Sequence, residues 1–217
     1  MLALGLPVIG VEPSCSAALV DEHPRLMGDT AETEPRRGGA EPMNLEAEQA
    51  AAPSCRELLG FIDEITEQRG AEVFLGEDEI EPIVAILHGH CQQKTKGWLE
   101  PAISLLGKVP GIEVRVTTAE CCGMAGSFGF KADFADVSIE LGNRLLQEIE
   151  SLQAEPGRDG AWRDEAGNDL AEAAGAEQGA RSRVEILASG TSCRAQIGDL
   201  SRNRARHPIE LIVERLR

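Results

Sequence analysis

The chain has 217 residues and a formal net charge of −16 at neutral pH, with 42% hydrophobic but only 3% aromatic residues. That length suffices for one generous domain or two small ones, and the core must be built from aliphatic side chains. The strong acidity excludes nucleic acid as an expected partner, because its negative phosphates would be repelled.

Cysteine usage and the lack of targeting signals indicate a reducing compartment. The first residues are apolar but lack the basic residues of a secretory signal, and no run approaches the roughly 18 apolar residues of a membrane span. The six cysteines are Cys15, Cys55, Cys91, Cys121, Cys122 and Cys193. We therefore expect a cytoplasmic protein, in which clustered cysteines serve metal or redox chemistry more often than disulfides.

The first quarter of the chain predicts a strand, a helix and a linker. Residues 6–11 form a short apolar run that is typical of a buried parallel strand. A helix is predicted over 17–26. Residues 27–53 are rich in Gly, Pro, Glu and Ala and show no hydrophobic period, so we interpret them as a linker or irregular surface.

An amphipathic helix is predicted over 55–69, because apolar residues recur there at helical spacing. Ser54 is a suitable N-cap for this helix. Cys55 would then lie in the first helical turn, as a small buried or idle residue.

From residue 83 onward, strands alternate with helices. We predict strands over 83–87, 113–118 and 184–188, and helices over 96–106, 134–152 and 209–216. This alternation predicts an α/β fold with a mainly parallel sheet and helices on both faces. Residues 154–182 interrupt the pattern with Gly, Ala, Asp and Glu, and we interpret them as a flexible acidic insertion.

The sequence also contains an internal echo. Residues 8–15 and residues 184–193 both consist of a β-branched run, a turn and then Ser-Cys. The echo suggests two related halves, of which the first is represented only by its tail.

Two adjacent cysteines, Cys121 and Cys122, lie in a glycine-rich loop directly after the strand predicted over 113–118. Gly123 and Gly126 in this loop can take a positive φ and let the backbone approach a bulky group closely. Because open α/β sheets bind ligands at the carboxyl ends of their strands, this loop is the first candidate for a functional site.

Two other predicted strands are followed by Cys91 and Cys193, so four thiols can converge. Four thiolates suit a tetrahedral Zn site or an iron–sulfur cluster. Adjacent cysteines fit one Zn ion poorly, because extended backbone directs neighbouring side chains to opposite faces, whereas in a turn both can face a larger cluster. Two alternatives stay open: buried free cysteines around a packed loop, and thiol–disulfide chemistry, which the strain of a vicinal disulfide disfavours.

Three histidines lie near these segments. His90, beside Cys91, could ligate a metal, contact a cluster sulfur or cap the strand end, and we single it out as the candidate for the sulfur contact. His88 is interpreted as a cap of the sheet edge. His207 precedes Pro208 and is interpreted as a structural turn residue.

These residues resemble the cysteine-rich CCG domain of heterodisulfide reductase subunits, the glycolate oxidase iron–sulfur subunit and the anaerobic glycerol-3-phosphate dehydrogenase electron-transfer subunit. The motifs are most similar to those of FAD-linked oxidases of the D-lactate and D-2-hydroxyglutarate dehydrogenase types, which fuse a flavin domain to an iron–sulfur module. The most specific part is the run CCGMAGSFG at 121–129. The resemblance covers roughly residues 1–25 and 80–216.

The resemblance implies an electron-transfer module. Its metal ligands would be Cys91, Cys121, Cys122 and Cys193, holding a 4Fe-4S cluster, and its cofactor-binding residues would be His90, Gly123 and Gly126. Electrons would come from FAD on a partner or on a further domain, and pass to a quinone or another acceptor. Association with the inner face of the membrane would occur only through partners.

The chain also departs from the family pattern. The fuller motif ends in CxxC, and Gly190 stands at the first of these cysteines, which leaves four ligands and favours a simple cubane over a five-cysteine noncubane cluster. We expect residues 1–26 to be the tail of a first repeat, 27–79 a linker with its helix, and 80–217 one complete repeat. The chain would then be a C-terminal fragment or split subunit. The competing interpretation is a structural or docking domain with free or Zn-bound cysteines.

Overall fold

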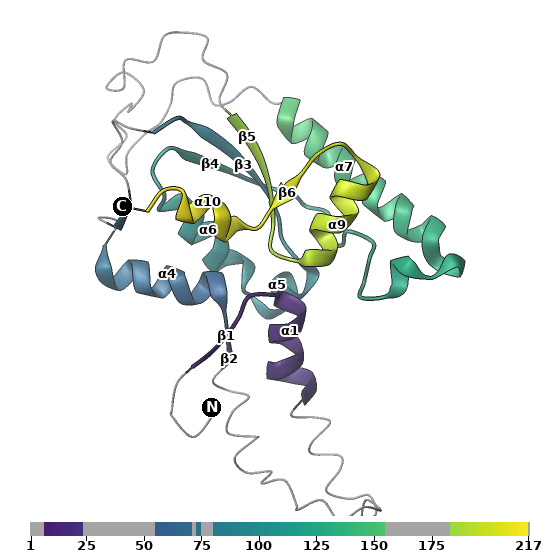
Figure 1. Ribbon diagram of the computed structural model, residues 1–217, viewed down its shortest axis with the longest axis horizontal. Coiled ribbons are helices and arrows are strands. Elements are labelled where there is room, and N and C mark those ends of the chain that lie inside the picture. Colours follow the sequence, from purple (N-terminus) through teal and green to yellow (C-terminus); the bar gives the residue numbers. More distant parts are fainter. Residues whose placement is uncertain (1–6, 24–54, 71–72, 75–79, 155–182, 217) are drawn as a thin grey trace, which may run out of the picture.

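A computed structural model describes residues 7–23, 55–70, 73–74, 80–154 and 183–216, and it contains two all-parallel sheets (Figure 1). The larger sheet has the strand order β4-β3-β5-β6. Its strands are β3 (Ile83–His88), β4 (Ile112–Val116), β5 (Arg183–Ala188) and β6 (Ala205–Arg206). The predicted α/β class with a parallel sheet is confirmed.

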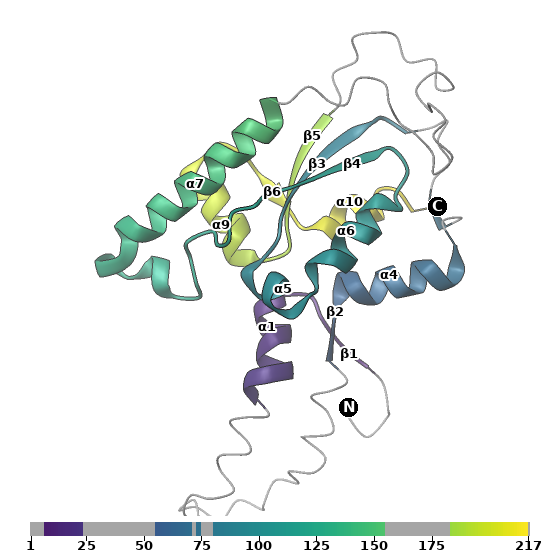
Figure 2. The ribbon, with the colours of Figure 1, turned by 180° about the vertical axis from the view of Figure 1, so that it is seen from behind.

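Helices cover both faces of this sheet, as predicted (Figures 1 and 2). Successive side chains of β3 point to opposite faces. Ile83, Ala85 and Leu87 pack with the helices of one face, and Val84 and Ile86 pack with those of the other. The helices of the first face are α4 (Leu58–Arg69), α6 (Leu99–Gly107) and α10 (Pro208–Val213), and those of the second are α7 (Ala135–Ala154) and α9 (Thr191–Leu200).

The predicted start of a helix at Cys55 was wrong, although Cys55 is buried, as predicted. Cys55 begins a short strand, β2 (Cys55–Glu57), and the helix starts only at Leu58, with the Glu57 side chain accepting a hydrogen bond from the amide of Gly60. The strand forms because Cys55 pairs in parallel register with Val8, 47 positions earlier in the chain. Helical spacing alone could not reveal this pairing.

The helix predicted over 96–106 was also placed too early. A separate helix, α5 (Cys91–Lys96), follows β3 directly and ends at Gly97, whose φ of 70° provides the left-handed C-cap. The next helix, α6, then begins at Leu99. The strand-end cysteine Cys91 is therefore the first residue of a helix.

The internal echo has a structural counterpart. In the amino-terminal part, β1 (Val8–Gly10) leads into α1 (Pro13–Ala17), and then come β2 and α4. This order repeats β5–α9–β6–α10, and both strand pairs are parallel. Unlike the buried strand that was predicted, β1 is only partly buried. The helix predicted over 17–26 starts at Pro13 and continues as a π-helical turn over Ala18–Glu22, and its last predicted residues lie outside the described part.

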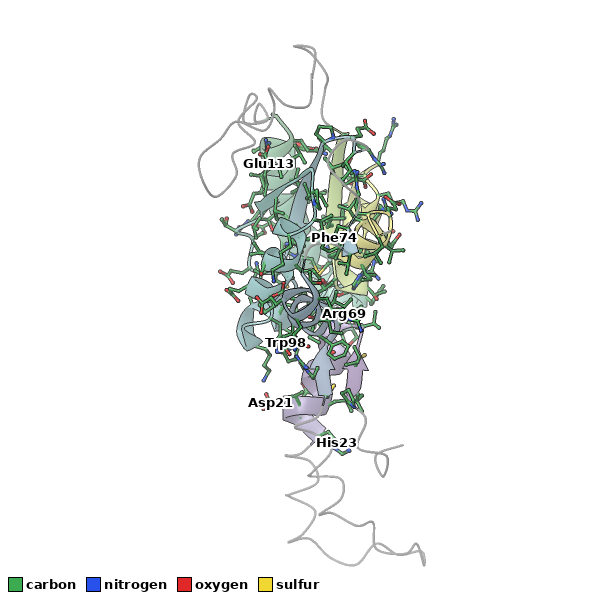
Figure 3. The ribbon with its side chains drawn as sticks, turned by 90° about the vertical axis from the view of Figure 1, so that its left-hand side faces the viewer. Asp21, His23, Arg69, Phe74, Trp98 and Glu113 are labelled. Atoms are coloured by element: carbon green, nitrogen blue, oxygen red, sulfur yellow. The ribbon has the colours of Figure 1, made fainter. Side chains whose placement is uncertain are left out.

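Figure 3 shows β1, β2 and α1 projecting from one end of the larger sheet, with Asp21 and His23 towards the tip. Almost all of the linker and the acidic insertion predicted over 27–53 and 154–182 lies outside the described residues. In the described part of the chain, no helix combines the length and the apolar character that crossing a bilayer requires.

We expect Leu87→Ala to lower the free energy of unfolding by about 2–5 kcal/mol, because Leu87 is fully buried in the central strand and its removal leaves a cavity. The exposed Val213→Ala should change it by less than about 0.5 kcal/mol. Urea denaturation of both variants measures the difference, and equal effects would contradict the placement of β3 at the centre of the core.

Candidate functional site

The order of the strands places a topological switch point at the carboxyl ends of β3 and β5. After β3 the chain crosses to β4 on one side, and the later β5 pairs on the other side, so that the connections diverge between β3 and β5. Ligands of open α/β sheets bind at such a switch point. The loops that follow β3, β4 and β5 carry Cys91, the pair Cys121–Cys122, and Cys193.

The four thiols that were predicted to converge lie next to one another. Cys91 is within hydrogen-bonding reach of Cys121, Cys121 of Cys122, and Cys122 of Cys193. Three loops that are far apart in sequence therefore bring their sulfur atoms into one row. Cys122 and Cys193 are buried, while Cys91 and Cys121 are half-buried and line the outer part of the row.

Hydrogen bonding along the row divides the thiols into two kinds. Interaction with Cys122 and with Cys91 lowers the pKa of Cys121, and interaction with Cys122 lowers the pKa of Cys193, whereas the pKa of Cys122 is raised by its interactions with Cys121 and Cys193 and by burial. The pKa of the Cys91 thiol is raised by its interaction with Cys121 and by burial. Thiolate character is thus concentrated on Cys121 and Cys193, and thiolates are the form that binds metals.

His88 does not cap an edge of the sheet, because β3 is a central strand and His88 is buried. Its Nδ1 lies 2.9 Å from Oγ1 of Thr117, and its Nε2 has no well-formed hydrogen bond within the described residues. The imidazole is nevertheless close enough to lower the pKa of Cys193. A buried ring nitrogen therefore faces the row of sulfur atoms.

His90 lies between two of the cysteine-bearing loops. Its Nδ1 is 3.8 Å from Sγ of Cys91 and accepts a hydrogen bond from the amide of Gln92 at 3.1 Å. On the other side, a Cβ atom on Gly190 would lie 2.2 Å from Cδ2 of His90 and 3.1 Å from Sγ of Cys193. Gly190 is therefore required by close packing of the histidine and the cysteine. His207 caps α10, as the interpretation of a turn residue implies.

Gly123 and Gly126 have different surroundings in the cysteine loop. Gly123 has a φ of 96°, and a Cβ atom there would lie 2.3 Å from the carbonyl oxygen of Ser138 in α7. Its amide donates to Sγ of Cys121 at 3.3 Å. Gly126 has a φ of 66°, and nothing described lies within 4 Å of a Cβ atom at that position. Gly126 therefore shapes an exposed turn, whereas Gly123 contacts a sulfur atom.

Two charged side chains hold the start of the cysteine loop, and no pattern in the sequence pointed to Glu148 as one of them. Glu148, in α7, accepts hydrogen bonds from the amides of Thr118 at 2.5 Å and Ala119 at 2.9 Å. The Lys94 ammonium, in α5, donates to the carbonyl oxygen of Ala119. No sequence signal connects Glu148 with a loop 30 positions earlier.

Two further residues that sequence reasoning missed lie in the amino-terminal segment. Glu12 accepts hydrogen bonds from the amide and the hydroxyl of Thr191, at the start of α9. Burial alone would raise the pKa of Glu12, but the bonds from Thr191 and the neighbouring His90 lower it overall. Ser14 Oγ lies 3.3 Å from Nε2 of His90. The internal echo was the signal that could have pointed to this segment.

The remaining cysteines stand apart from the row. Cys15 is exposed in α1, and Cys55 is buried in β2, where burial raises its pKa. Among the residues that the structure describes, no three or more His, Cys, Asp or Glu side chains are arranged to hold a metal ion as they stand.

The two loop glycines give a matched pair of variants. We expect Gly123→Ala to lower the free energy of unfolding by about 3 kcal/mol or more, because it adds a clash with the Ser138 carbonyl to an unfavourable φ. Gly126→Ala should lower the free energy of unfolding by only about 1 kcal/mol, because the left-handed φ is its one unfavourable feature. Chemical denaturation compares them, and a Gly126→Ala loss as large as that of Gly123→Ala would refute this description of the loop.

Glu148 supplies a test with pH. Burial raises its pKa, but the bonds from Thr118 and Ala119 lower it below the ordinary value of 4.5. Such a group stabilises the fold above its unfolded-state pKa, and the contribution is lost as pH falls through the folded-state value. Glu148→Gln should therefore lower the free energy of unfolding by about 1 kcal/mol near neutral pH, a small value because the carboxylate is partly exposed.

At a pH well below both pKa values, the Glu148→Gln variant and the wild type should have equal stability. The matched control is Glu150→Gln, which changes an exposed carboxylate on the same helix. A Glu148→Gln effect that persists unchanged into strong acid would show that the carboxylate charge does not hold the loop.

The chain is distantly similar to dehydrogenase proteins. It is 26% identical over 212 residues to the C subunit of anaerobic glycerol-3-phosphate dehydrogenase from Escherichia coli strain K12, an alignment that covers 98% of this chain and 41% of the relative. The same values hold for the corresponding protein of E. coli O157:H7. It is also 24% identical over 217 residues to D-2-hydroxyglutarate dehydrogenase of Pantoea ananatis, covering 97% of this chain and 16% of the relative.

These relatives are much longer than the aligned part. The chain spans about two fifths of the length of the glycerol-3-phosphate dehydrogenase subunit and about one sixth of the hydroxyglutarate dehydrogenase. No family model matches the chain, and no solved structure matches it. The similarity therefore relates the chain to oxidoreductases, specifically to a stretch shared by two dehydrogenase proteins.

Proposed function

We propose that the chain is the iron–sulfur electron-transfer part of an FAD-linked oxidoreductase that acts on a 2-hydroxy acid. The observation that carries the proposal is the row of four thiols, which three loops bring together at the switch point of a parallel sheet. The distant similarity to two dehydrogenase proteins supports an oxidoreductase setting.

The donor set agrees in chemistry with a 4Fe-4S cluster. Four thiolates are the usual ligands of such clusters, and a bound cluster would accept and release single electrons. The ligands would be Cys91, Cys121, Cys122 and Cys193. The amide of Gly123 and the imidazole of His88 would offer hydrogen bonds to sulfur, which tune the reduction potential, while His90 would pack against Cys91.

The unequal burial of the cysteines suggests how electrons would enter and leave. Cys122 and Cys193 lie against the apolar core beneath α7 and α9, which keeps water from that side of the site. Cys91 and Cys121 are half-buried, so a partner could approach a bound group only from their side. A short distance between a bound cluster and a partner on this side would favour electron transfer. Burial of the opposite side would limit side reactions.

The proposed partner is a flavin-containing dehydrogenase domain or subunit, which would perform the hydride chemistry on its FAD. The electron acceptor would be a quinone or another carrier. The strong negative charge argues against nucleic acid as a partner. The proposed location is the cytoplasm, with association at the inner face of the membrane through partners.

The domain division is also a proposal. Residues 1–26 would be the tail of a first repeat, 27–79 a linker with the α4 helix, and 80–217 the complete cysteine-rich repeat. The repeated order of β1, α1, β2 and α4 supports a relation between the two parts. The chain would then be a C-terminal fragment or split subunit of a longer enzyme.

One observation favours a second candidate, a structural or docking domain with free or Zn-bound cysteines. The four thiols already interact with one another, as free cysteines in a packed core would. Their positions in a row, two of them adjacent in sequence, are less suited to one tetrahedral Zn ion than to a group with several metal atoms.

Anaerobic reconstitution with iron and sulfide separates the two candidates. We expect a brown protein with a broad visible absorption and about four iron and four sulfide per chain. Alanine at any of the four cysteines should reduce the absorption and the iron content to a small fraction of the wild-type values. Cys15→Ala and Cys55→Ala are the matched controls and should load normally, because both thiols lie outside the row.

A colourless protein with about one tightly bound Zn ion per chain would support the second candidate. Normal iron loading of Cys193→Ala would overturn the proposed ligand set, since that thiol is the most enclosed of the four. Circular dichroism of each variant shows that lost loading is not lost folding.

A further inference from the structure

The amino-terminal segment contacts the cysteine site directly. One oxygen of the Glu12 carboxylate accepts hydrogen bonds from the amide of Thr191 at 2.8 Å and from its hydroxyl at 2.9 Å. Thr191 is the first residue of α9, the helix that carries Cys193. A residue 179 positions away therefore caps the helix on which one of the proposed ligands lies.

The other carboxylate oxygen of Glu12 is connected to His90 by hydrogen bonds through the Ser14 hydroxyl. The Ser14 hydroxyl donates to Oε1 of Glu12 at 3.2 Å and lies 3.3 Å from Nε2 of His90. Since Nδ1 of His90 accepts from the Gln92 amide, Nε2 is the protonated nitrogen in the neutral ring and donates to Oγ of Ser14. Glu12, Ser14 and His90 thus form a continuous relay in which each hydrogen bond has a defined direction.

The histidine at the end of this relay is held on its other sides by the cysteine loops. Its ring is buried, Nδ1 is 3.8 Å from Sγ of Cys91, and Gly190 next to Cys193 packs against Cδ2. The ring therefore has little room to rotate. The Gln92 amide on Nδ1 and the Ser14 hydroxyl on Nε2 therefore both favour the ring with its proton on Nε2 and with Nδ1 towards the Cys91 sulfur.

Independent contacts hold the segment in place. Ser16 donates to the backbone carbonyl of Glu12 at 3.1 Å, and Asp21 forms an ion pair with Lys96 of α5 at 2.8 Å. Lys96 lies on the helix that begins with Cys91, so the segment has an attachment to α5 that does not involve Glu12 or Ser14. Loss of the relay alone should consequently leave the segment docked.

We propose that Glu12 and Ser14 are positioning residues of the cysteine site, which hold His90 in its Nε2-protonated form with Nδ1 towards Cys91. The segment of residues 12–16 is then a working part of the site, although it belongs to the other strand–helix unit. The inference concerns residues of this chain, and only its consequence for a bound cluster rests on the proposed function.

The first test uses the metal-free chain with nitrogen-15-labelled histidine. In the wild type, magnetic resonance should show His90 predominantly with a proton on Nε2 and none on Nδ1. Ser14→Ala should reduce the fraction of this tautomer severalfold, and Ser14→Thr, which keeps the hydroxyl, should restore it. An unchanged tautomer in Ser14→Ala, with the fold intact by circular dichroism, would overturn the proposal.

Glu12→Gln and Glu22→Gln are the matched pair for the carboxylate. Both remove one negative charge from the same segment, but Glu22 is exposed and belongs to the π-helical turn after α1. Glu12→Gln should lower the Nε2-protonated fraction of His90, whereas Glu22→Gln should leave it as in the wild type. Equal responses in the two variants would show that general charge, and not the relay, acts on His90.

The second test uses the reconstituted protein and measures its midpoint potential. Glu12→Gln should shift the potential to a more positive value than Glu22→Gln does, because loss of the nearer negative charge favours the reduced, more negative form of the site. Equal shifts would overturn the electrostatic part of the proposal. If the wild type binds no cluster, the proposed function fails, and the tautomer measurement on the metal-free chain still decides whether the relay exists.

Discussion

The parallel pairing of β3 with both β4 and β5 is the constraint on which the site depends. Parallel strands end at the same edge of a sheet, so the pairing fixes where all three cysteine-bearing loops emerge. The pairing of β3 with β5 extends to the last residue of both strands, since His88 pairs with Ala188 directly before the two loops. Without that register, the thiols of Cys91 and Cys193 would have no reason to meet the vicinal pair.

Side chains outside the cysteines then set the positions of the loops. Glu148 and Lys94 hold the entry to the vicinal pair from two different helices, and Arg194 donates to the carbonyl oxygens of Ala188 and Ser189 below Cys193. Each brace joins a charged group to backbone atoms, and such hydrogen bonds are stronger than those between neutral groups. The row of sulfur atoms is therefore supported by the backbone around it, whether or not a metal is bound.

Much of the fold could be predicted from the sequence. The apolar runs of β3 and β5 and the long amphipathic α7 follow local period, and the prediction of a parallel sheet follows from their alternation. Prediction from hydrophobic periodicity failed at Cys55, because β2 exists only through its pairing with β1, in which Cys55 pairs with Val8. It also failed at Gly97, where one left-handed residue separates two helices. Both features depend on contacts or a conformation that hydrophobic spacing does not encode. The candidate site shows the same division: cysteines at strand ends could be found from residue type and position, whereas Glu148 and Ser14 contact the site only through the folded chain.

The connection between α7 and β5 has a practical consequence. Ala154 and Arg183 stand at the amino end of the sheet, the end opposite to the thiols, as Figure 1 shows for the start of β5. A fluorescent label, an affinity handle or a surface attachment introduced at either of these two residues would leave the cysteine edge accessible. The geometry thus provides an anchoring point from which the protein can be immobilised with its thiol-bearing edge turned towards an electrode or a soluble carrier.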